Sequence, residues 1–186
     1  MARPNKRDEA LKAVVTIIER DGLTALTLDA VAAETGMTRA GLLYHFPSRE
    51  DLILATHEYL AGSWEKAMTQ SAGKSVDQAA AEERHAAYIK VCAKSARRVE
   101  LLLMLESSDD PELALLWQQV MDRWAPPSPP PSAADSQDMD AFIARLAADG
   151  LWVHEALSAR QLPQELRRRV SARLVAMSNG SISEKQ

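Results

Sequence analysis

Apolar residues recur along this chain at intervals of three and four positions, which is the spacing of one face of an α-helix. Near the start, Leu11, Val14 and Ile18 form such a stripe, and a longer stripe begins at Met139. No segment shows the alternation of apolar and polar residues that a half-buried strand requires. The pattern therefore predicts an all-α protein with about nine helices.

Glycine and proline divide the helical pattern into segments. Gly22, Gly36 and Gly73 stand where helices should end, and Pro111 stands where one should begin. The Pro-rich stretch 125–136 cannot continue a helix and predicts a loop. We expect helices over residues 6–20, 28–35, 39–44, 48–72, 76–94, 101–106, 111–124, 137–158 and 163–179.

Residues 27–52 have the pattern of two short helices across a tight turn, followed by the start of a third. Thr27 and Thr38 are each placed to cap the first turn of a helix through a side-chain oxygen. Gly36 between them accepts the positive φ that a sharp helix end demands. This order of helix, glycine turn and helix is the layout of a helix-turn-helix DNA-binding motif.

The second of these helices would lie in the DNA major groove, with its first residues near the base edges. Small side chains at Ala40 and Gly41 would let it approach the groove floor, and Arg39 carries the forked donors that suit guanine or phosphate. The hydroxyl of Tyr44 and the imidazole of His45 would reach phosphate oxygens. The expected DNA-contacting residues are Thr27, Thr38, Arg39, Ala40, Gly41, Tyr44, His45 and Arg49.

The formal net charge of the chain is −4, which is unusual for a protein that binds phosphates. Residues 1–50 hold seven basic and seven acidic side chains, so the acidic excess lies in the remainder. Attraction to DNA must then come from the local placement of a few cations, and long-range steering should be weak.

Cys92 is the only cysteine, which excludes a disulfide within the chain and a metal site built from several thiolates. The four histidines are scattered without a zinc-binding spacing, and no glycine-rich loop could cradle a phosphate. We therefore expect neither an enzyme nor a bound cofactor. No apolar run approaches about 18 residues, and the basic start of the chain leads into an amphipathic helix, so we expect a cytoplasmic protein.

Residues 22–52 also carry a more specific signature. Its members are Gly22-Leu23, Thr27, Val31-Ala32, Gly36 followed by an apolar residue and Thr38, Leu42, Tyr44, Phe46 and the run Arg49–Leu52. This stretch resembles the DNA-binding domain of the TetR (tetracycline-repressor) family, and with the first helix the resemblance covers about 50 residues. Leu43 departs from the pattern, because several relatives carry a second aromatic or polar groove residue at this position.

The resemblance implies a three-helix DNA-binding domain over residues 1–47 and a helical effector-binding and dimerisation domain over residues 48–186. Relatives are mostly repressors that dimerise through their last two long helices and bind a palindromic operator. They release the operator when a small molecule enters the second domain. The long helix that follows Ser48 would link the two domains mechanically.

The last two expected helices each carry an apolar stripe that a monomer should not expose. Gly150 lies within the first stripe, where a glycine costs about 1 kcal/mol against alanine and is best explained by the close approach of another helix. The arginines at 167–169 are interpreted as solvated surface. The expected homodimer interface includes Phe142, Leu146, Gly150, Val153, Val170 and Leu174.

Large aromatic and methionine side chains fall on helices that the resemblance places around a ligand cavity. Four tryptophans against two phenylalanines favour flat walls with a polar handle, which suit a mostly apolar effector. The alternative is that these side chains are ordinary core. Polar contacts could come from His85, Glu106 or Glu155. The expected ligand-binding residues are Trp64, Met68, His85, Tyr88, Met104, Trp117, Met121 and Trp124.

A different class of function stays open at this stage. The chain could be a DNA-binding or architectural factor without an effector, controlled by a partner protein that docks on the Pro-rich loop 125–136. A sealed core in the second domain would favour this alternative. A cavity lined by the tryptophans and methionines would favour a small-molecule sensor.

Overall fold

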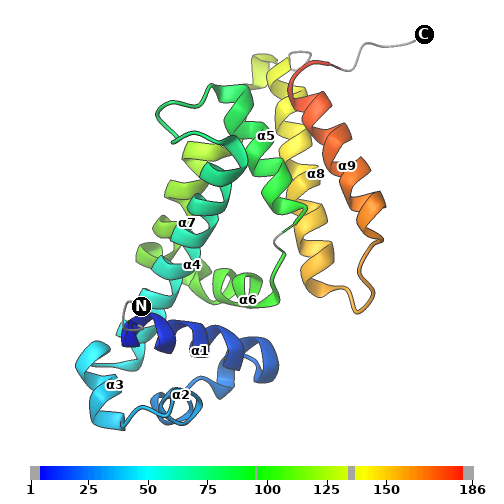
Figure 1. Cartoon of the computed structure of the whole chain (residues 1–186). Helices are drawn as coiled ribbons and strands as arrows, with labels where there is room; N and C mark the ends of the chain where they lie inside the picture. The colour runs from blue at the N-terminus through cyan, green and yellow to red at the C-terminus, as the bar shows by residue number, and fades with distance from the viewer. Residues whose placement is uncertain (1–4, 95, 134–136, 182–186) are drawn as a thin grey trace. The chain divides into compact units, whose positions relative to one another are not determined.

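The computed structural model describes residues 5–94, 96–133 and 137–181. Over these ranges the chain forms nine α-helices and three short 3-10 turns and no β-strand, which confirms the predicted all-α architecture (Figure 1). The helices are α1 (Lys6–Asp21), α2 (Leu28–Thr35), α3 (Arg39–His45), α4 (Arg49–Ala72), α5 (Ala81–Cys92), α6 (Arg98–Glu106), α7 (Pro111–Trp124), α8 (Gln137–Leu157) and α9 (Gln164–Ser178).

The chain divides into two compact units. The first consists of Met1–Gly62 and Arg98–Trp117, and the second consists of Ser63–Arg97 and Gln118–Gln186. Helices α4 and α7 therefore each contribute residues to both units.

In the first unit, α1 packs on α2 and on α6, and α2 packs on α3. The apolar stripe of α1 is buried as its spacing predicts, because Leu11 and Ile18 are almost inaccessible to solvent. Val31 of α2 and Leu42 of α3 are fully buried as well. Each such aliphatic side chain contributes about 1.5–3 kcal/mol through its burial, which holds the two short helices in place.

Local hydrogen bonds fix where α2 and α3 begin. Thr27 Oγ1 accepts a hydrogen bond from the backbone N–H of Ala30 at 3.1 Å, and Thr38 Oγ1 accepts one from Gly41 at 3.1 Å. Gly36 between the helices has a φ of 66°, the left-handed conformation that ends α2. These contacts confirm the predicted caps and the helix-turn-helix geometry that they define.

In the second unit, α8 packs on α9, and α5 packs on both (Figure 1). Ala144 and Ala148 are fully buried on the inner face of α8, where small side chains let neighbouring helices approach closely. Trp152 continues this face and is buried too. The buried face of α8 therefore runs through small residues and then reaches a large indole.

Helix α5 begins later than its apolar spacing predicts. The helix starts at Ala81 rather than near residue 76, and residues 75–79 form a turn and bend instead. A carboxylate oxygen of Glu83 accepts a hydrogen bond from the backbone N–H of Ala80 at 2.9 Å. This cap at the first turn fixes the start of the helix, which the apolar pattern alone cannot locate.

Other helix bounds lie close to the expected ones. Helix α7 spans Pro111–Trp124, as the proline at its first position predicts. Helix α6 begins at Arg98, three residues before the expected start. Its first turn carries charged residues, so the apolar run 101–106 does not reveal this turn. The Pro-rich loop holds a 3-10 turn at Pro131–Ala133, and its residues 134–136 lie outside the described residues. None of the described helices is both long enough and apolar enough to cross a membrane.

Candidate functional site

Helix α3 presents an exposed polar surface around a buried anchor. Leu42 has no accessible surface, whereas Tyr44 is 84 % exposed. Thr38, Arg39 and Ala40 at the start of the helix are exposed as well. The residues that we expect near DNA bases therefore share one accessible helix start.

Gly41 and His45 complete the expected surface of α3, and both are partly buried. A methyl group added to Gly41 would lie 3.1 Å from Thr38 Oγ1, so the cap of this helix itself favours glycine. The His45 ring lies edge-on to the Tyr44 ring, with 5.2 Å between their centroids. The imidazole and the phenol thus lie together at the far end of the helix.

The guanidinium of Arg39 is held across the turn by Asp29 of α2. Arg39 Nη1 lies 2.5 Å from Asp29 Oδ1, and both side chains are more than half exposed. An exposed ion pair contributes only about 0–1 kcal/mol to stability. Arg39 can therefore exchange Asp29 for a phosphate or a guanine edge at little cost.

Arg49 has a structural contact that its sequence position does not reveal. Its Nε donates a hydrogen bond to the carbonyl oxygen of Leu26 at 3.2 Å, which ties the start of α4 to the segment before α2. This bond uses one of the five donors of the guanidinium. The terminal nitrogens can still donate to a phosphate.

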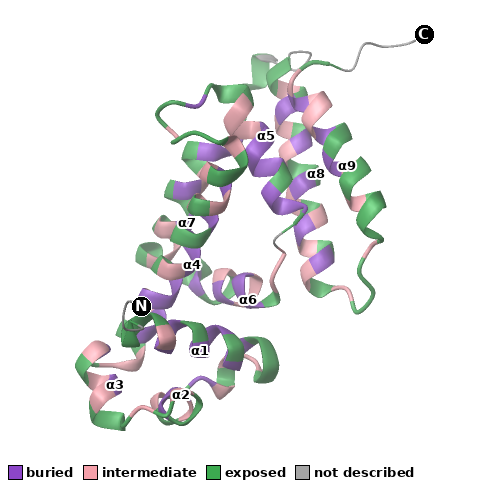
Figure 2. Cartoon of the chain, viewed as in Figure 1, coloured by how far each residue is buried: buried purple, intermediate pink, exposed green. Residues whose placement is uncertain are grey.

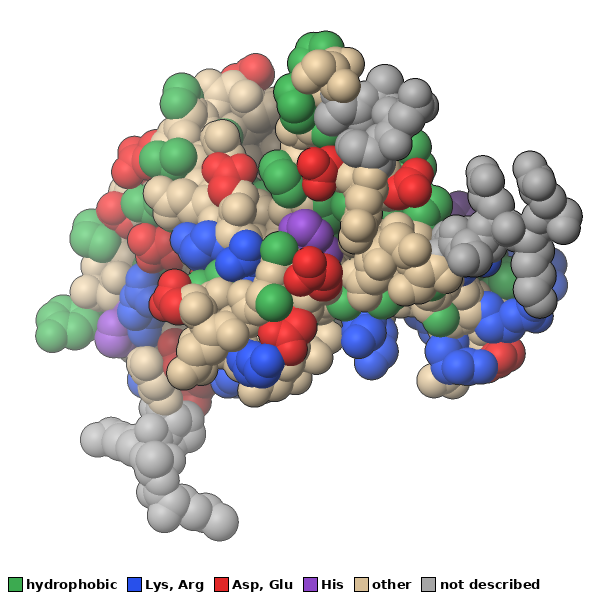
Figure 3. Space-filling model, turned by 90° about the horizontal axis from the view of Figure 1, so that it is seen from above, with side chains coloured by type: hydrophobic (Ala, Val, Ile, Leu, Met, Phe, Trp, Pro, Cys, Tyr) green, Lys and Arg blue, Asp and Glu red, His purple; other side chains and the backbone are tan. Residues whose placement is uncertain are grey.

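Charges of both signs are mixed on the molecular surface. On the face drawn in Figure 3, Lys and Arg side chains lie among Asp and Glu side chains. Residues 1–50 likewise carry equal numbers of acidic and basic side chains. DNA affinity would therefore rest on individual contacts such as those of Arg39 and Arg49.

The second unit buries an aromatic cluster, made by Trp64 of α4, Tyr88 of α5 and Trp152 of α8. The ring centroid of Trp64 lies 5.8 Å from that of Trp152 at an interplanar angle of 79°, and 6.4 Å from that of Tyr88. Such aromatic pairs contribute about 0.5–1.5 kcal/mol beyond their buried area. The indole nitrogens of both tryptophans are buried, and neither has a hydrogen-bond partner in the part of the chain that the structure describes. The cluster therefore holds two donors that an incoming acceptor could satisfy.

Asp149 of α8 lies beside this aromatic cluster. It accepts a hydrogen bond from the Tyr88 hydroxyl, and Arg145 Nε lies 3.8 Å from its other carboxylate oxygen. Burial raises the pKa of Asp149 above its usual range, and burial raises the pKa of Tyr88 too. Only the i, i+4 spacing of Arg145 and Asp149 signals this pair in the sequence, and nothing local signals its contact with Tyr88.

Three other expected ligand residues lie in the second unit with different surroundings. Met68 and Trp124 have no accessible surface, and Met121 is partly buried. Trp124 Nε1 donates to a carboxylate oxygen of Glu65 at 3.4 Å. Burial of this kind fits ordinary core as well as the wall of a ligand site.

His85 lies in a small groove of its own. The groove has a volume of about 150 Å³ and is lined by residues 127–130 of the Pro-rich loop and by Asp138. Burial lowers the pKa of His85. The structure therefore brings Trp64 and Tyr88 into contact and places His85 beside the loop.

Met104 and Trp117 belong to the first compact unit. Met104 is partly buried, and Trp117 donates from Nε1 to Nδ1 of His57 at 2.8 Å. His57 is fully buried, its burial lowers its pKa, and its Nε2 has no hydrogen-bond partner among the described residues. His57 is thus a further buried polar group. In the sequence, only its position on the inner side of α4 indicates that it is buried.

An apolar surface extends along α8 and the start of α9, where Figure 2 shows exposed and partly exposed positions between the buried ones. Leu146 is 53 % exposed, and Ile143, Leu157 and Leu166 are similarly accessible. A methyl group added to Gly150 would meet no described atom within 4 Å, so none of the described helices packs closely enough to require that glycine. Among the expected interface residues, Phe142, Val153 and Val170 are partly exposed and Leu174 is buried within the chain.

Arg167 is not the solvated residue that the run of three arginines indicates. Its Nη1 lies 3.4 Å from a carboxylate oxygen of Glu155, whose side chain is 2 % exposed. Consecutive helical residues point about 100° apart, so a charge run in sequence does not share one face. The interpretation of this run as solvated surface is therefore wrong for Arg167, whereas Arg169 is exposed.

Several known proteins resemble this chain. The HTH-type transcriptional regulator YerO of Bacillus subtilis, itself uncharacterized, is 30 % identical over 57 residues, which span 31 % of this chain and 20 % of that protein. The multidrug binding protein EbrR in complex with malachite green has a similar fold, with a TM-score of 0.61 and 20 % identity over 92 % of this chain and 98 % of that one. A candidate transcriptional regulator from Saccharomonospora viridis in complex with choline has a TM-score of 0.66 and 20 % identity over 91 % of this chain and 94 % of that one.

Two family models match the chain directly. Residues 10–56 match the model described as bacterial regulatory proteins of the tetR family. Residues 82–179, more than half of the chain, match the model described as the tetracyclin repressor-like C-terminal domain. Together with the helix-turn-helix geometry, these matches show that the chain belongs to the TetR family of transcriptional regulators.

Proposed function

We propose that this chain is a dimeric transcriptional repressor that binds a palindromic operator and releases it when a small, mostly apolar molecule binds. One observation carries this proposal: α3 leaves Thr38, Arg39 and Tyr44 accessible around the buried Leu42. Recognition of bases in the major groove requires a helix whose first residues are exposed and polar. Here the glycine turn before α3 holds such a helix in place. We assign DNA binding to residues 1–47 and dimerisation and effector binding to residues 48–186, in a cytoplasmic protein.

The apolar surface of α8 and α9 supports the dimer. Leu146 and Leu157 are exposed on α8, and Gly150 between them has open space that a second helix can occupy. Burying this surface against a second copy removes apolar area from water on both chains. The dimer would have to present its two recognition helices to half-sites about 34 Å apart.

The buried aromatic cluster of Trp64, Tyr88 and Trp152 supports the effector. Two indole N–H groups without acceptors are costly in a protein interior, and a ligand that accepts from them would recover this cost. Apolar walls with a few polar groups are typical of small-molecule sites. The structural neighbours in complex with malachite green and with choline support small organic molecules as the class of effector.

A DNA-binding factor without an effector is the second candidate function. The close packing of Trp64 against Trp152 favours it, since a ring pair at 5.8 Å leaves no room between the two indoles for a ligand. In this case a protein partner would control DNA binding through the Pro-rich loop. The two functions differ in one measurable property, the response of operator affinity to small molecules.

Selection of bound sequences from a random DNA pool tests the proposal. A palindromic consensus, bound with high affinity in a fluorescence anisotropy titration at fixed salt, is the expected result. Malachite green, ethidium and choline are then added as first probes, followed by a wider set of apolar compounds. If the pool yields no preferred sequence, the proposed repressor function is wrong. If a preferred sequence emerges and no compound changes its affinity, the effector-free factor is the better description.

A further inference from the structure

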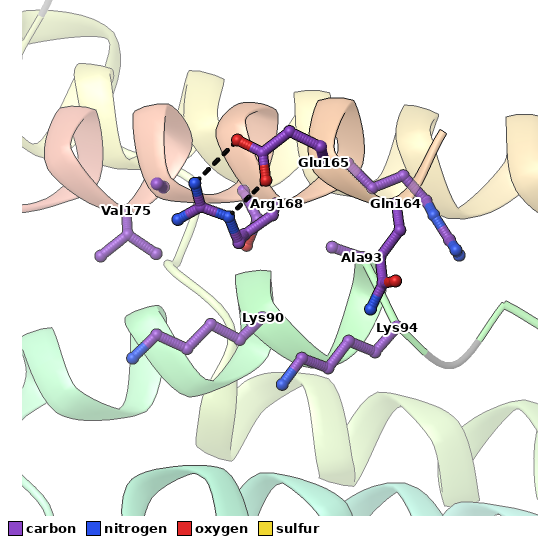
Figure 4. Close-up of a pocket in the computed structure, with 10 residues that line it drawn as sticks. Lys90, Ala93, Lys94, Gln164, Glu165, Arg168 and Val175 are labelled. Carbon is purple, nitrogen blue, oxygen red and sulfur yellow. Dashed lines mark hydrogen bonds and ion pairs between the residues drawn. The ribbon is translucent and has the colours of Figure 1, made fainter. Parts of the chain in front are cut away.

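A large groove lies between the second half of α5 and the first half of α9, within the second unit. Its volume is about 880 Å³, at the upper end of the range of about 300–1,000 Å³ that small-molecule sites occupy. Figure 4 shows Lys90 and Lys94 on the α5 side and the paired Glu165 and Arg168 on the α9 side. None of the residues that we assign to DNA, effector or dimer contacts lines this groove.

The groove carries an excess of positive charge. Lys90 of α5 and Lys94, in the turn after the end of α5, line one side of it, and Arg167 and Arg168 line the other side from α9. Glu165 is the one acidic side chain among its lining residues, and it is already paired with Arg168 at 2.8 Å. The other three cations, Lys90, Lys94 and Arg167, therefore line the groove and are not paired with Glu165. This local excess of positive charge occurs in a chain whose net charge is −4.

Three of these basic groups have donors free for a ligand. Neither Lys90 nor Lys94 forms an ion pair with any residue that the structure describes. Arg167 Nε is buried and has no hydrogen-bond acceptor among the residues that the structure describes, although the same guanidinium pairs with Glu155 through Nη1. A buried charged donor without an acceptor is costly, so an anion in the groove would satisfy it.

The remaining surface of the groove is aliphatic. Ala93, which follows the last residue of α5, and Ala172 and Val175 of α9 line it between the charged groups. Bare phosphate would leave these groups in contact with water, whereas an alkyl chain would cover them. The combination of cations with an aliphatic wall selects a molecule that is both anionic and apolar.

We propose that the α5–α9 groove binds an amphipathic organic anion, with a phosphate or carboxylate head group on Lys90, Lys94 and Arg167 and an alkyl body on Ala93, Ala172 and Val175. This site goes beyond the proposed effector site, which lies at Trp64, Tyr88 and Trp152. Lys90 and Lys94 are four residues apart across the end of α5 and both line the groove, so both ammonium groups can reach one head group.

Isothermal titration calorimetry of the full chain without DNA tests this proposal, with dodecyl phosphate below its critical micelle concentration as the probe. We expect saturable binding that weakens as salt is raised, because the head group is held by exposed charges. Inorganic phosphate provides the head without the tail, and dodecyltrimethylammonium provides the same tail with the opposite charge. Both should bind at least tenfold more weakly. Equal binding of inorganic phosphate, or of the cationic amphiphile, would overturn the proposal.

Variants locate the binding. Lys94→Glu and Ala172→Phe should each weaken dodecyl phosphate at least tenfold, the first through charge and the second by filling the groove without any change of charge. Lys66→Glu is the matched control, since Lys66 is an exposed lysine on α4 that does not line the groove. If the control weakens binding as much as Lys94→Glu, only the net charge matters and the site is wrong.

Competition with DNA separates this proposal from the proposed function. A duplex that lacks the operator should not displace dodecyl phosphate, and its displacement would show that the groove is a phosphate-backbone surface instead. The Arg39→Ala variant should bind the amphiphile as the unaltered chain does. Loss of operator binding and loss of amphiphile binding are therefore separate results.

Discussion

The indole nitrogen of Trp117 donates a hydrogen bond to Nδ1 of His57 at 2.8 Å, between two buried side chains that are 60 residues apart. Because an indole nitrogen can only donate, Nδ1 must be the unprotonated nitrogen, and Nε2 carries the hydrogen of the neutral ring. That second nitrogen is buried and has no partner within the ranges that the structure describes. His57 is thus a neutral imidazole held in one tautomer, and burial lowers its pKa.

This pair should make the stability of the chain depend on pH. Since the pKa of His57 is lower in the folded chain, the unfolded chain binds more protons. The contribution of the neutral His57 ring to the free energy of unfolding is complete above the unfolded pKa of about 6.5. It is lost as the pH falls below this value toward the lower pKa of the folded chain. His57→Gln keeps an acceptor for Trp117 but does not titrate. In urea unfolding, this variant should lose less stability than the unaltered chain between about pH 7.5 and about pH 5.5.

Trp117→Phe is the companion variant, because it removes the donor and keeps a histidine that titrates. It should lower the free energy of unfolding by about 1–3 kcal/mol at neutral pH, the cost of leaving a buried acceptor unpaired. Its stability should still fall with pH. If the His57→Gln profile is as steep as that of the unaltered chain, the titrating group lies elsewhere.

The parts of the fold that the sequence predicts are those set by neighbours along the chain. Thr27 and Thr38 cap the helices that follow them, and Gly36 takes the left-handed conformation, because each contact spans at most three residues. Pro111 marks the start of α7 for the same reason. Local chemistry of this kind favours the same helix boundary in many tertiary settings.

The contacts that define the second unit join residues far apart in the chain. Tyr88 reaches Asp149 across 61 positions, and Trp64 meets Trp152 on another helix. Apolar spacing shows that such residues are buried but does not show which partner they meet. The α5–α9 groove depends on the packing of two helices, so no motif in the sequence signals it.

Arg39→Ala should weaken operator binding by about 1–3 kcal/mol and relax the preference at one base position. The reason is the exposed guanidinium at the start of α3, which forms an exposed ion pair with Asp29. Tyr44→Ala should weaken all sequences alike, since a phenol at this end of the helix reaches phosphate. Anisotropy titrations at one salt concentration measure both effects.

Arg20→Ala is the matched control for this experiment. Arg20 is an exposed arginine of the same unit, and it pairs with Asp21 and Glu34 rather than standing on α3. We expect its operator affinity to stay within about threefold of the unaltered value, because a surface ion pair contributes little. Unchanged affinity in both Arg39→Ala and Tyr44→Ala would refute the docking of α3 in the major groove.

Leu146→Glu should convert the dimer to monomers. Leu146 is 53 % exposed on α8, and a carboxylate buried against a second copy would lose its hydration without a partner. Leu115→Glu is the control, since Leu115 on α7 is 49 % exposed but lies outside the α8 and α9 surface. Sedimentation velocity at micromolar concentration should show monomers only for Leu146→Glu. A monomeric unaltered chain would refute the proposed dimer itself.

Trp64→Phe should weaken the effector about tenfold while sparing operator binding in its absence. The indole nitrogen of Trp64 is buried and has no partner among the described residues. A ligand that accepts from it therefore gains a hydrogen bond of about 1.4 kcal/mol that phenylalanine cannot offer. The variant keeps an aromatic ring for the edge-to-face contact with Trp152, which limits the effect on packing. The compound that lowers operator affinity in the screen is titrated by tryptophan fluorescence and by anisotropy.

Thermodynamic linkage between the operator site and the effector site provides a check on the titrations. The factor by which the effector lowers operator affinity must equal the factor by which the operator lowers effector affinity. Trp152→Phe removes the other unpartnered indole donor of the same cluster, so it reports which nitrogen the ligand uses. If both variants bind the compound as the unaltered chain does, the effector does not bind at this cluster. If both variants bind the compound equally weakly and circular dichroism shows an altered fold, a third variant is needed. Tyr88→Phe then tests the cluster by removing the hydroxyl that donates to Asp149.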